Sequence, residues 1–171
     1  MKINKLYAKC NSYKNVNGKA IERDLKTVEY IVIHYTGNNG DTAENNCKYF
    51  ATSNTRSAGA HYFINRDGSV WCSVKPTWTA WAVGGSKQSS NGGDLYGICT
   101  NANSISIELC DIASKDASTE QIESCKALIK KIKKKCPNVV DVIRHFDVNG
   151  KNCPSRYVKD EKWEKFRKAV E

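Results

Sequence analysis

Two segments far apart in the chain carry residue types that bind catalytic transition metals. The first is the apolar run 31–33, which leads directly into His34. The second follows the largely apolar run 139–143 and contains His145 and, eight positions later, Cys153. Two imidazoles and one thiolate form a three-ligand zinc set with an open fourth position, which is typical of catalytic zinc rather than structural zinc. If the two segments meet in space, the sequence predicts a zinc-dependent hydrolase.

Each of these residues also has a purely structural interpretation. A single histidine can be a core residue bonded to backbone, and a single cysteine is often a small buried hydrophobe. His34 and His145, two of only three histidines, both lie where an apolar strand gives way to a glycine-containing loop. Functional side chains are often placed at such strand ends, which favours the ligand interpretation. Cys153 lies in a polar turn near Lys151, and we expect that ammonium group to lower the pKa of the thiol.

Hydrophobic periodicity and turn signals predict the elements that must position these side chains. A tight turn at 66–68 is expected to join two strands as a hairpin. The full set of expected strands is 28–35, 60–65, 69–74, 104–109 and 139–143, and the expected helices are 41–52, 118–135 and 160–170. Strands mixed with helices along the whole length predict a single α/β domain, residues 1–171, with a central mixed β-sheet flanked by helices.

One acidic residue interrupts the pattern of a predicted strand. Ile105, Ile107 and Leu109 alternate along the chain and form one apolar face. Glu108 has the opposite parity, so its carboxylate points either to solvent or into a cleft, and the sequence leaves both open. In a cleft beside a metal, a carboxylate can accept a proton from the attacking water and later donate it to the leaving group.

A long connection follows the hairpin. Residues 84–103 are rich in Gly, Ser and Asn and predict a surface loop, and long loops in compact domains are often functional. Trp78 and Trp81 precede this loop and are assigned equally to a substrate groove or to the core. His61, the third histidine, enters an apolar strand, where we expect a structural role or a place in the groove wall.

Composition narrows the possible partners. The net charge of +9 favours an anionic partner through long-range attraction. Part of this charge lies in the lysine-rich run 126–135, which fits a solvated helix face better than a dedicated binding patch, and both stay open at this point. The chain has neither basic motifs interleaved with aromatic residues nor a recognisable reading helix, so no nucleic-acid partner is expected.

Cysteine usage and the apolar runs indicate the compartment. The chain has eight cysteines without a CxxC pair, and it is long enough to form a core without disulfides. We therefore expect mostly buried free thiols in a reducing cytoplasm. No apolar run approaches the length of a membrane span, and the first residues lack the apolar region of a secretory signal.

Four segments, taken in order, resemble the motifs of a known enzyme family: 30–37, 57–71, 103–110 and 144–154. They resemble the type-2 zinc-dependent N-acetylmuramoyl-L-alanine amidases. This family includes phage endolysins and shares its fold with peptidoglycan recognition proteins. The resemblance spans roughly residues 28–156. It implies cleavage of bacterial peptidoglycan between N-acetylmuramic acid and L-alanine. The missing secretory signal fits a phage or prophage endolysin that is held in the cytoplasm until release to the wall, and it also fits a cytosolic recycling amidase. Anionic wall polymers would suit the positive charge.

The resemblance also implies residue roles. His34, His145 and Cys153 match the zinc ligands. Glu108 matches the glutamate that activates the attacking water in one branch of the family, and Lys151 matches a lysine that stabilises the oxyanion. A non-catalytic peptidoglycan recognition module is the alternative, and the presence of Cys153 argues against it because such modules lose the cysteine ligand.

Two positions depart from the family pattern. Another branch has a catalytic tyrosine just before the hairpin histidine, where this chain has Ala60, and Tyr62 is not its equivalent. Many relatives have a substrate-side histidine where this chain has Ala82. The first departure shifts the activating role to Glu108, and the second leaves substrate contacts near Ala82 open.

Overall fold

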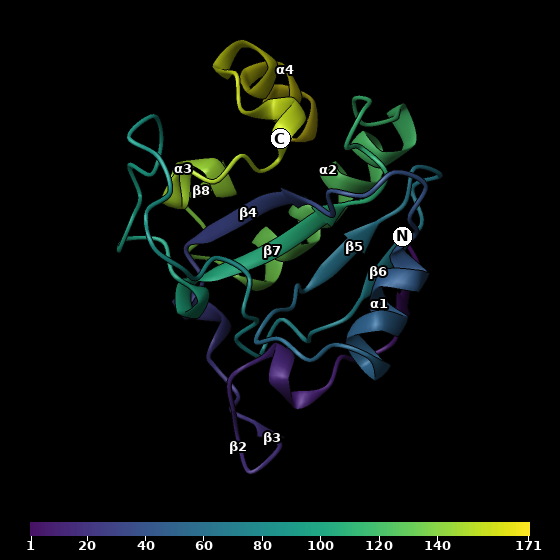
Figure 1. The fold of residues 1–171 in the computed structure, drawn as a ribbon, viewed down its shortest axis with the longest axis vertical. Coiled ribbons are helices and arrows are strands. Elements are labelled where there is room, and N and C mark those ends of the chain that lie inside the picture. The colour runs from purple at the N-terminus through teal and green to yellow at the C-terminus, as the bar shows by residue number, and fades with distance from the viewer.

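Six strands form one mixed sheet in the order β1-β6-β5-β7-β4-β8 (Figure 1). In this computed structural model, which describes residues 1–171, β5 and β6 pair antiparallel and every other pair in the sheet is parallel. The strands are β1 (Ile3–Lys5), β4 (Tyr30–Tyr35), β5 (Tyr62–Ile64), β6 (Val70–Cys72), β7 (Ser104–Leu109) and β8 (Asp141–Arg144); β2 (Asn15–Val16) and β3 (Lys19–Ala20) form a separate small hairpin. The predicted α/β fold with a central mixed sheet is confirmed.

Four helices flank the sheet: α1 (Ala43–Thr52), α2 (Thr119–Lys135), α3 (His145–Asn149) and α4 (Asp160–Val170). The start of α2 is a capping box, in which Ser118 Oγ accepts from the Gln121 amide and the Gln121 side chain accepts from the Ser118 amide. α1 begins after Thr42, whose side chain accepts from the amide of Asn45. These local signals explain why α1 and α2 lie close to their predicted ranges, and α4 also matches its predicted range.

Three features differ from the sequence predictions. The edge strand β1 was not expected, because Ile3–Lys5 contains one apolar residue and gives no periodic signal. α3 was not expected either, since five residues are too few for a helical period. The strand predicted at 139–143 begins instead at Asp141, and Val140 is 71% exposed because it lies before the strand pairs with β4.

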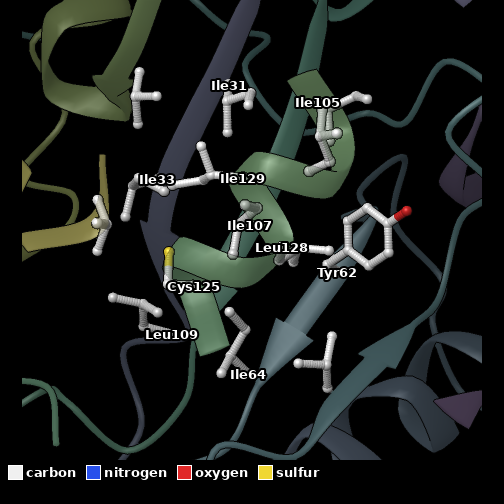
Figure 2. Close-up of a cluster of buried hydrophobic side chains, with 14 of the residues drawn as sticks. Ile31, Ile33, Tyr62, Ile64, Ile105, Ile107, Leu109, Cys125, Leu128 and Ile129 are labelled. Carbon is white, nitrogen blue, oxygen red and sulfur yellow. The ribbon is translucent and has the colours of Figure 1, made fainter. Parts of the chain in front are cut away.

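The main core lies between α2 and one face of the sheet (Figures 1 and 2). Ile31 and Ile33 of β4 point toward α2, as do Ile105, Ile107 and Leu109 of β7. α2 contributes the buried side chains Cys125, Leu128 and Ile129, and α4 packs beside it. Because strand side chains alternate between faces, His34 and Glu108 lie on the opposite face of the sheet from α2.

Truncating the core side of α2 is expected to destabilise the fold strongly. Leu128 is fully buried against the sheet, so Leu128→Ala removes apolar contacts and leaves a cavity. We expect the free energy of unfolding to fall by about 2–5 kcal/mol, measured by urea denaturation. Glu123→Ala, at an exposed position of the same helix, should stay within about 0.5 kcal/mol of the parent. A loss at Leu128 no larger than at Glu123 would contradict this packing.

The cysteines are all free thiols. Seven of the eight are buried and only Cys10 is exposed, which confirms the expectation that most are small buried hydrophobes. None of the helices is both long and apolar enough to cross a membrane.

Candidate metal centre and cleft

Three donor side chains converge at the end of the sheet. β4 ends beside β8, and β8 leads directly into α3, whose first residue is His145. Cys153 lies in the loop after α3, and its carbonyl accepts from the amide of Phe146 at 2.8 Å, which holds that loop against the helix. The ligand atoms of His34, His145 and Cys153 all lie within 4.8 Å of one another. The two distant segments therefore meet in space.

The nitrogens of these histidines lack ordinary partners. Nε2 of His34 and both ring nitrogens of His145 are buried without a hydrogen-bond partner. Buried polar atoms normally have a partner, because leaving one unpaired is costly. His34 Nδ1 lies 3.8 Å from Cys153 Sγ. Ligand atoms on one tetrahedral zinc, at about 2.1 Å for nitrogen and 2.3 Å for sulfur, lie roughly 3.6 Å apart. The donor set therefore fits one bound metal ion.

Both imidazoles are neutral and free to coordinate. Burial lowers the pKa of His34 well below its usual value, and the neighbouring His145 and Lys151 lower it further. Burial and the charge of Lys151 lower the pKa of His145 to about 3. A neutral imidazole keeps the lone pair that a metal requires.

The expectation of a lowered thiol pKa at Cys153 is wrong. Burial raises this pKa to about 12, and the nearby Glu108 carboxylate adds to the rise. The backbone amide of Tyr35 and the ammonium group of Lys151 act in the lowering direction but do not outweigh the loss of solvent. Cys153 is only 2% exposed, so a polar sequence context did not mean a solvated thiol. A bound cation would favour the thiolate at this position.

Glu108 points into the cleft rather than to solvent. It pairs in register with His34 on the neighbouring strand, and it lines the same cavity as His34 and Cys153. Its Oε2 atom is buried without a hydrogen-bond partner. Burial raises the pKa of its carboxyl to about 7, with Lys151 opposing this shift and Asp41 adding to it. A carboxyl group with a pKa near neutrality can both accept and donate a proton.

The cleft consists of two adjoining cavities. The first, of about 640 Å³, is lined by Glu108 and Cys153 and by polar residues of α1 and the loops around it. The second, of about 520 Å³, is lined by His145 and by parts of the 84–103 loop. Both are bordered by Ser57, Ala58, Trp81, Ala82 and Lys151. Together they form a groove that passes the three metal donors, and Lys151 lies between its two halves.

Comparison with known proteins identifies the family. The family model described as N-acetylmuramoyl-L-alanine amidase matches residues 24–156. The chain belongs to this family. It is 31% identical over 173 residues to the amidase BlyA of Bacillus subtilis (strain 168), with 94% of this chain and 46% of BlyA covered. It is 27% identical to the amidase CwlL of Bacillus licheniformis, with 100% of this chain and 47% of CwlL covered. The chain thus spans about half the length of these curated relatives.

Solved structures share the fold. The catalytic domain of XlyA superposes with a TM-score of 0.74 at 21% sequence identity, and the match covers 100% of both chains. PlyL superposes with a TM-score of 0.72 at 23% identity and covers 100% of this chain and 98% of its own. At these identities the likeness concerns the fold alone.

Of the three residues expected near the substrate groove of this amidase-family chain, only Trp81 lines the cleft. The Trp78 ring packs on Tyr13 at a centroid distance of 4.6 Å, and its Nε1 donates to Glu22. His61 is buried, and its ring nitrogens lie near Ser106 Oγ, Arg23 and the Trp78 carbonyl. The positions of His61 and Trp78 indicate structural roles, because neither side chain reaches the groove.

Several cleft residues were not foreseen from the sequence. α1 contributes Asn45 and Tyr49, which are four positions apart and so share one helical face. Arg56 follows α1, and its side chain forms no ion pair in the structure. The order of elements along the chain gave the one available signal. Because α1 is the first helix after His34, its polar face could be expected near the end of β4.

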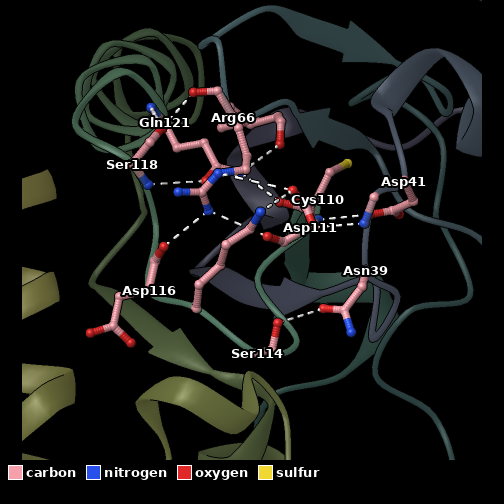
Figure 3. A network of polar contacts seen from close by, with 12 residues as sticks. Asn39, Asp41, Arg66, Cys110, Asp111, Ser114, Asp116, Ser118 and Gln121 are labelled. Carbon is pink, nitrogen blue, oxygen red and sulfur yellow. Dashed lines mark hydrogen bonds and ion pairs between the residues drawn. The ribbon is translucent and has the colours of Figure 1, made fainter.

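A polar network fixes the loops that follow β4, β5 and β7 (Figure 3). Asp41 Oδ1 accepts from the Asp111 amide at 2.7 Å, and Asp111 Oδ1 accepts from the Gly40 amide at 2.6 Å. Arg66 donates to the Asp111 carbonyl, while Gln121 Nε2 donates to the carbonyls at positions 64 and 110. These bonds join three strand ends to the start of α2, so the cleft is built on a rigid base.

Proposed function

We propose that this chain is a zinc-dependent amidase that cleaves peptidoglycan between N-acetylmuramic acid and the L-alanine of the stem peptide. The observation that carries the proposal is the convergence of His34, His145 and Cys153 beside Glu108 in an open groove. Family membership supports the same reaction. The relatives BlyA and CwlL are named as amidases of this kind.

His34, His145 and Cys153 would hold the ion. A mixed nitrogen and sulfur donor set suits zinc better than magnesium or calcium, which prefer oxygen ligands. Such an ion would bind the buried histidine nitrogens that have no hydrogen-bond partner, and the three donors lie close enough together to share it. When bound, zinc polarises a carbonyl oxygen and lowers the pKa of a water molecule to about 7.

Glu108 would move the protons in this reaction. Glu108 lines the groove, where its carboxylate can accept a proton from the water that attacks the amide carbonyl. The same carboxyl can then donate that proton to the nitrogen of L-alanine as the carbon–nitrogen bond breaks. Lys151 borders both cavities, and its ammonium group would stabilise negative charge on the carbonyl oxygen.

The arrangement of donors also suggests how the substrate lies. Glu108 lines only the first cavity, and His145 lines only the second. The leaving nitrogen must reach Glu108, so the stem peptide would extend into the first cavity, beside α1. The muramoyl group and its glycan strand would then occupy the second cavity, beside the 84–103 loop.

The proposed site of action is the bacterial cell wall. Proteins with the same fold include endolysins, among them a mutant endolysin from Bacillus subtilis that covers 100% of this chain at a TM-score of 0.74. An endolysin acts on a large polymer, and an open groove suits such a substrate.

Digestion of purified peptidoglycan with and without a zinc chelator would test the proposal. We expect the zinc-loaded chain to release stem peptides that begin with free alanine while leaving glycan strands intact, as identified by mass spectrometry. The chelator should abolish this release, and added zinc should restore it. Intact peptidoglycan after treatment with a folded, zinc-loaded sample would favour the non-catalytic recognition module. Cut glycan strands would contradict amidase chemistry.

A further inference from the structure

A cluster of unpaired lysines covers one side of α2. Five exposed lysines of this helix form no ion pair, and we call them the α2 lysine face: Lys126, Lys130, Lys131, Lys134 and Lys135. The sixth lysine of the helix, Lys133, is paired with Glu171 at 3.0 Å. Lys126 and Lys130 also border a hollow of about 370 Å³ between α2 and the end of α4. A large part of the net charge of +9 is thus concentrated on one helix.

The α2 lysine face points away from the cleft. α2 packs on the sheet through Leu128 and Ile129, on the face that carries Ile33 (Figure 2). His34 and Glu108 lie on the other face of the same strands. A ligand bound to the lysines would therefore leave the groove open to substrate.

Helix stability does not account for the lysines of this face that precede the last turn, Lys126, Lys130 and Lys131. Lys126 and Lys130 are four positions apart, as are Lys130 and Lys134, and Lys131 and Lys135. Like charges at this spacing repel each other and destabilise a helix. Lysines in the last turn interact favourably with the helix dipole, but Lys126 and Lys130 lie too far from that end to do so. A local arrangement that opposes stability points to a function.

We propose that the α2 lysine face binds wall polymers with repeating phosphodiester groups, such as teichoic acids. This inference rests on the proposed function at the cell wall. Successive lysines four positions apart rise about 6 Å along the helix, which presents charge at regular intervals to a linear polyanion. Lysine ammonium groups act as hydrated point charges that suit phosphates without reading a sequence. Binding here would hold the groove close to its insoluble substrate and so raise the local concentration of substrate at the groove.

The chemistry of the face favours a wall polymer over nucleic acid or a membrane. α2 contains no aromatic residue, and the aromatic residues of the adjacent α4, Trp163 and Phe166, are buried. Binding of single-stranded nucleic acid relies on aromatic side chains that stack on bases. An interfacial membrane helix needs an exposed apolar face, whereas the apolar side of α2 is buried in the core.

Charge removal on this face, compared with equal charge removal elsewhere, tests the inference. The test variant replaces four lysines with glutamine: Lys126→Gln, Lys130→Gln, Lys131→Gln and Lys134→Gln. The control variant makes four such changes at exposed lysines outside α2 that form no ion pair: Lys2→Gln, Lys14→Gln, Lys19→Gln and Lys48→Gln. Both variants have the same net charge. Binding of the zinc-loaded chains to walls is measured by cosedimentation over a range of salt concentrations, on native walls and on walls stripped of phosphate polymers.

We expect the test variant to lose at least tenfold in affinity for native walls. The slope of the logarithm of its binding constant against the logarithm of the salt concentration should become shallower by about 3, at roughly 0.7 per lysine for a single-stranded polyanion. The control variant should change less than twofold, and stripped walls should bind the parent as weakly as native walls bind the test variant. Equal losses in both variants, or unchanged binding of the parent to stripped walls, would overturn the inference. Tighter binding to single-stranded DNA than to the wall polymer would also overturn it.

Hydrolysis of a soluble muramoyl-peptide separates this inference from the proposed function. Both variants should keep the parent value of kcat/KM on this substrate, because their changes lie outside the groove. If the parent fails to cleave it, the proposed function fails, while the binding comparison still decides the role of the α2 lysine face. Circular dichroism and the Tm check that both variants fold.

Discussion

Glu108→Gln is expected to slow amide hydrolysis by about 10²–10⁴-fold while zinc remains bound. Glutamine has nearly the same shape as glutamate but cannot accept a proton from water at neutral pH. Glu108 is half-buried in the cleft, and its buried Oε2 atom has no hydrogen-bond partner, so the change breaks no observed hydrogen bond at that oxygen. The rate of stem-peptide release from peptidoglycan and the zinc content per chain would be measured on the same samples.

Two further variants make this result specific. Glu44→Gln removes an exposed carboxylate from the first turn of α1 and should leave the rate within twofold of the parent. Glu108→Asp keeps the carboxylate on a shorter side chain and should retain more activity than Glu108→Gln. Near-parental activity of Glu108→Gln would exclude this residue as the proton carrier. Loss of zinc from the same variant would instead indicate that the carboxylate helps to hold the metal.

Much of this geometry was foreseeable, because it depends on strand parity. The alternation of Ile105, Ile107 and Leu109 required Glu108 to point away from α2. What parity could not decide was whether that other face was solvent or cleft. The answer came from packing between distant segments, since residues of α1 and of the loop after α3 line one cavity with Glu108, and partial burial there raises the pKa of its carboxyl.

The metal donors show the same division between local and tertiary information. Residue types predicted the donor set of His34, His145 and Cys153, and the structure brings their ligand atoms together. The pKa of Cys153 was predicted in the wrong direction, because a local sequence reports neighbouring charges but not desolvation. The sequence likewise could not tell which of Trp78 and Trp81 lines the groove. The structure separates them, because Trp78 packs on Tyr13 and donates to Glu22 instead.

Cys153→Ser is expected to abolish stoichiometric zinc binding and, with it, peptidoglycan hydrolysis. The thiolate is the softest of the three donors, and a hydroxyl group at this buried position would bind zinc far less well. Zinc at 1,000 times its dissociation constant stabilises a folded chain by about 4.1 kcal/mol, so added zinc should raise the Tm of the parent and not that of Cys153→Ser. Metal content would be measured on dialysed protein. Cobalt substitution adds a spectroscopic test, because a sulfur-to-cobalt charge-transfer band requires the thiolate.

Cys10→Ser is the matched control, since Cys10 is the one exposed thiol and lies outside the cleft. It should bind zinc and hydrolyse peptidoglycan as the parent does. If Cys153→Ser still bound one zinc per chain and stayed active, His34 and His145 would need a third ligand from the same cavity. Glu108 is the carboxylate that pairs in register with His34, so it would be the first candidate. The proposed role of Glu108 as proton carrier would then fail as well. Cys153→Ser and Glu108→Gln together therefore test both the metal ligands and the proton carrier.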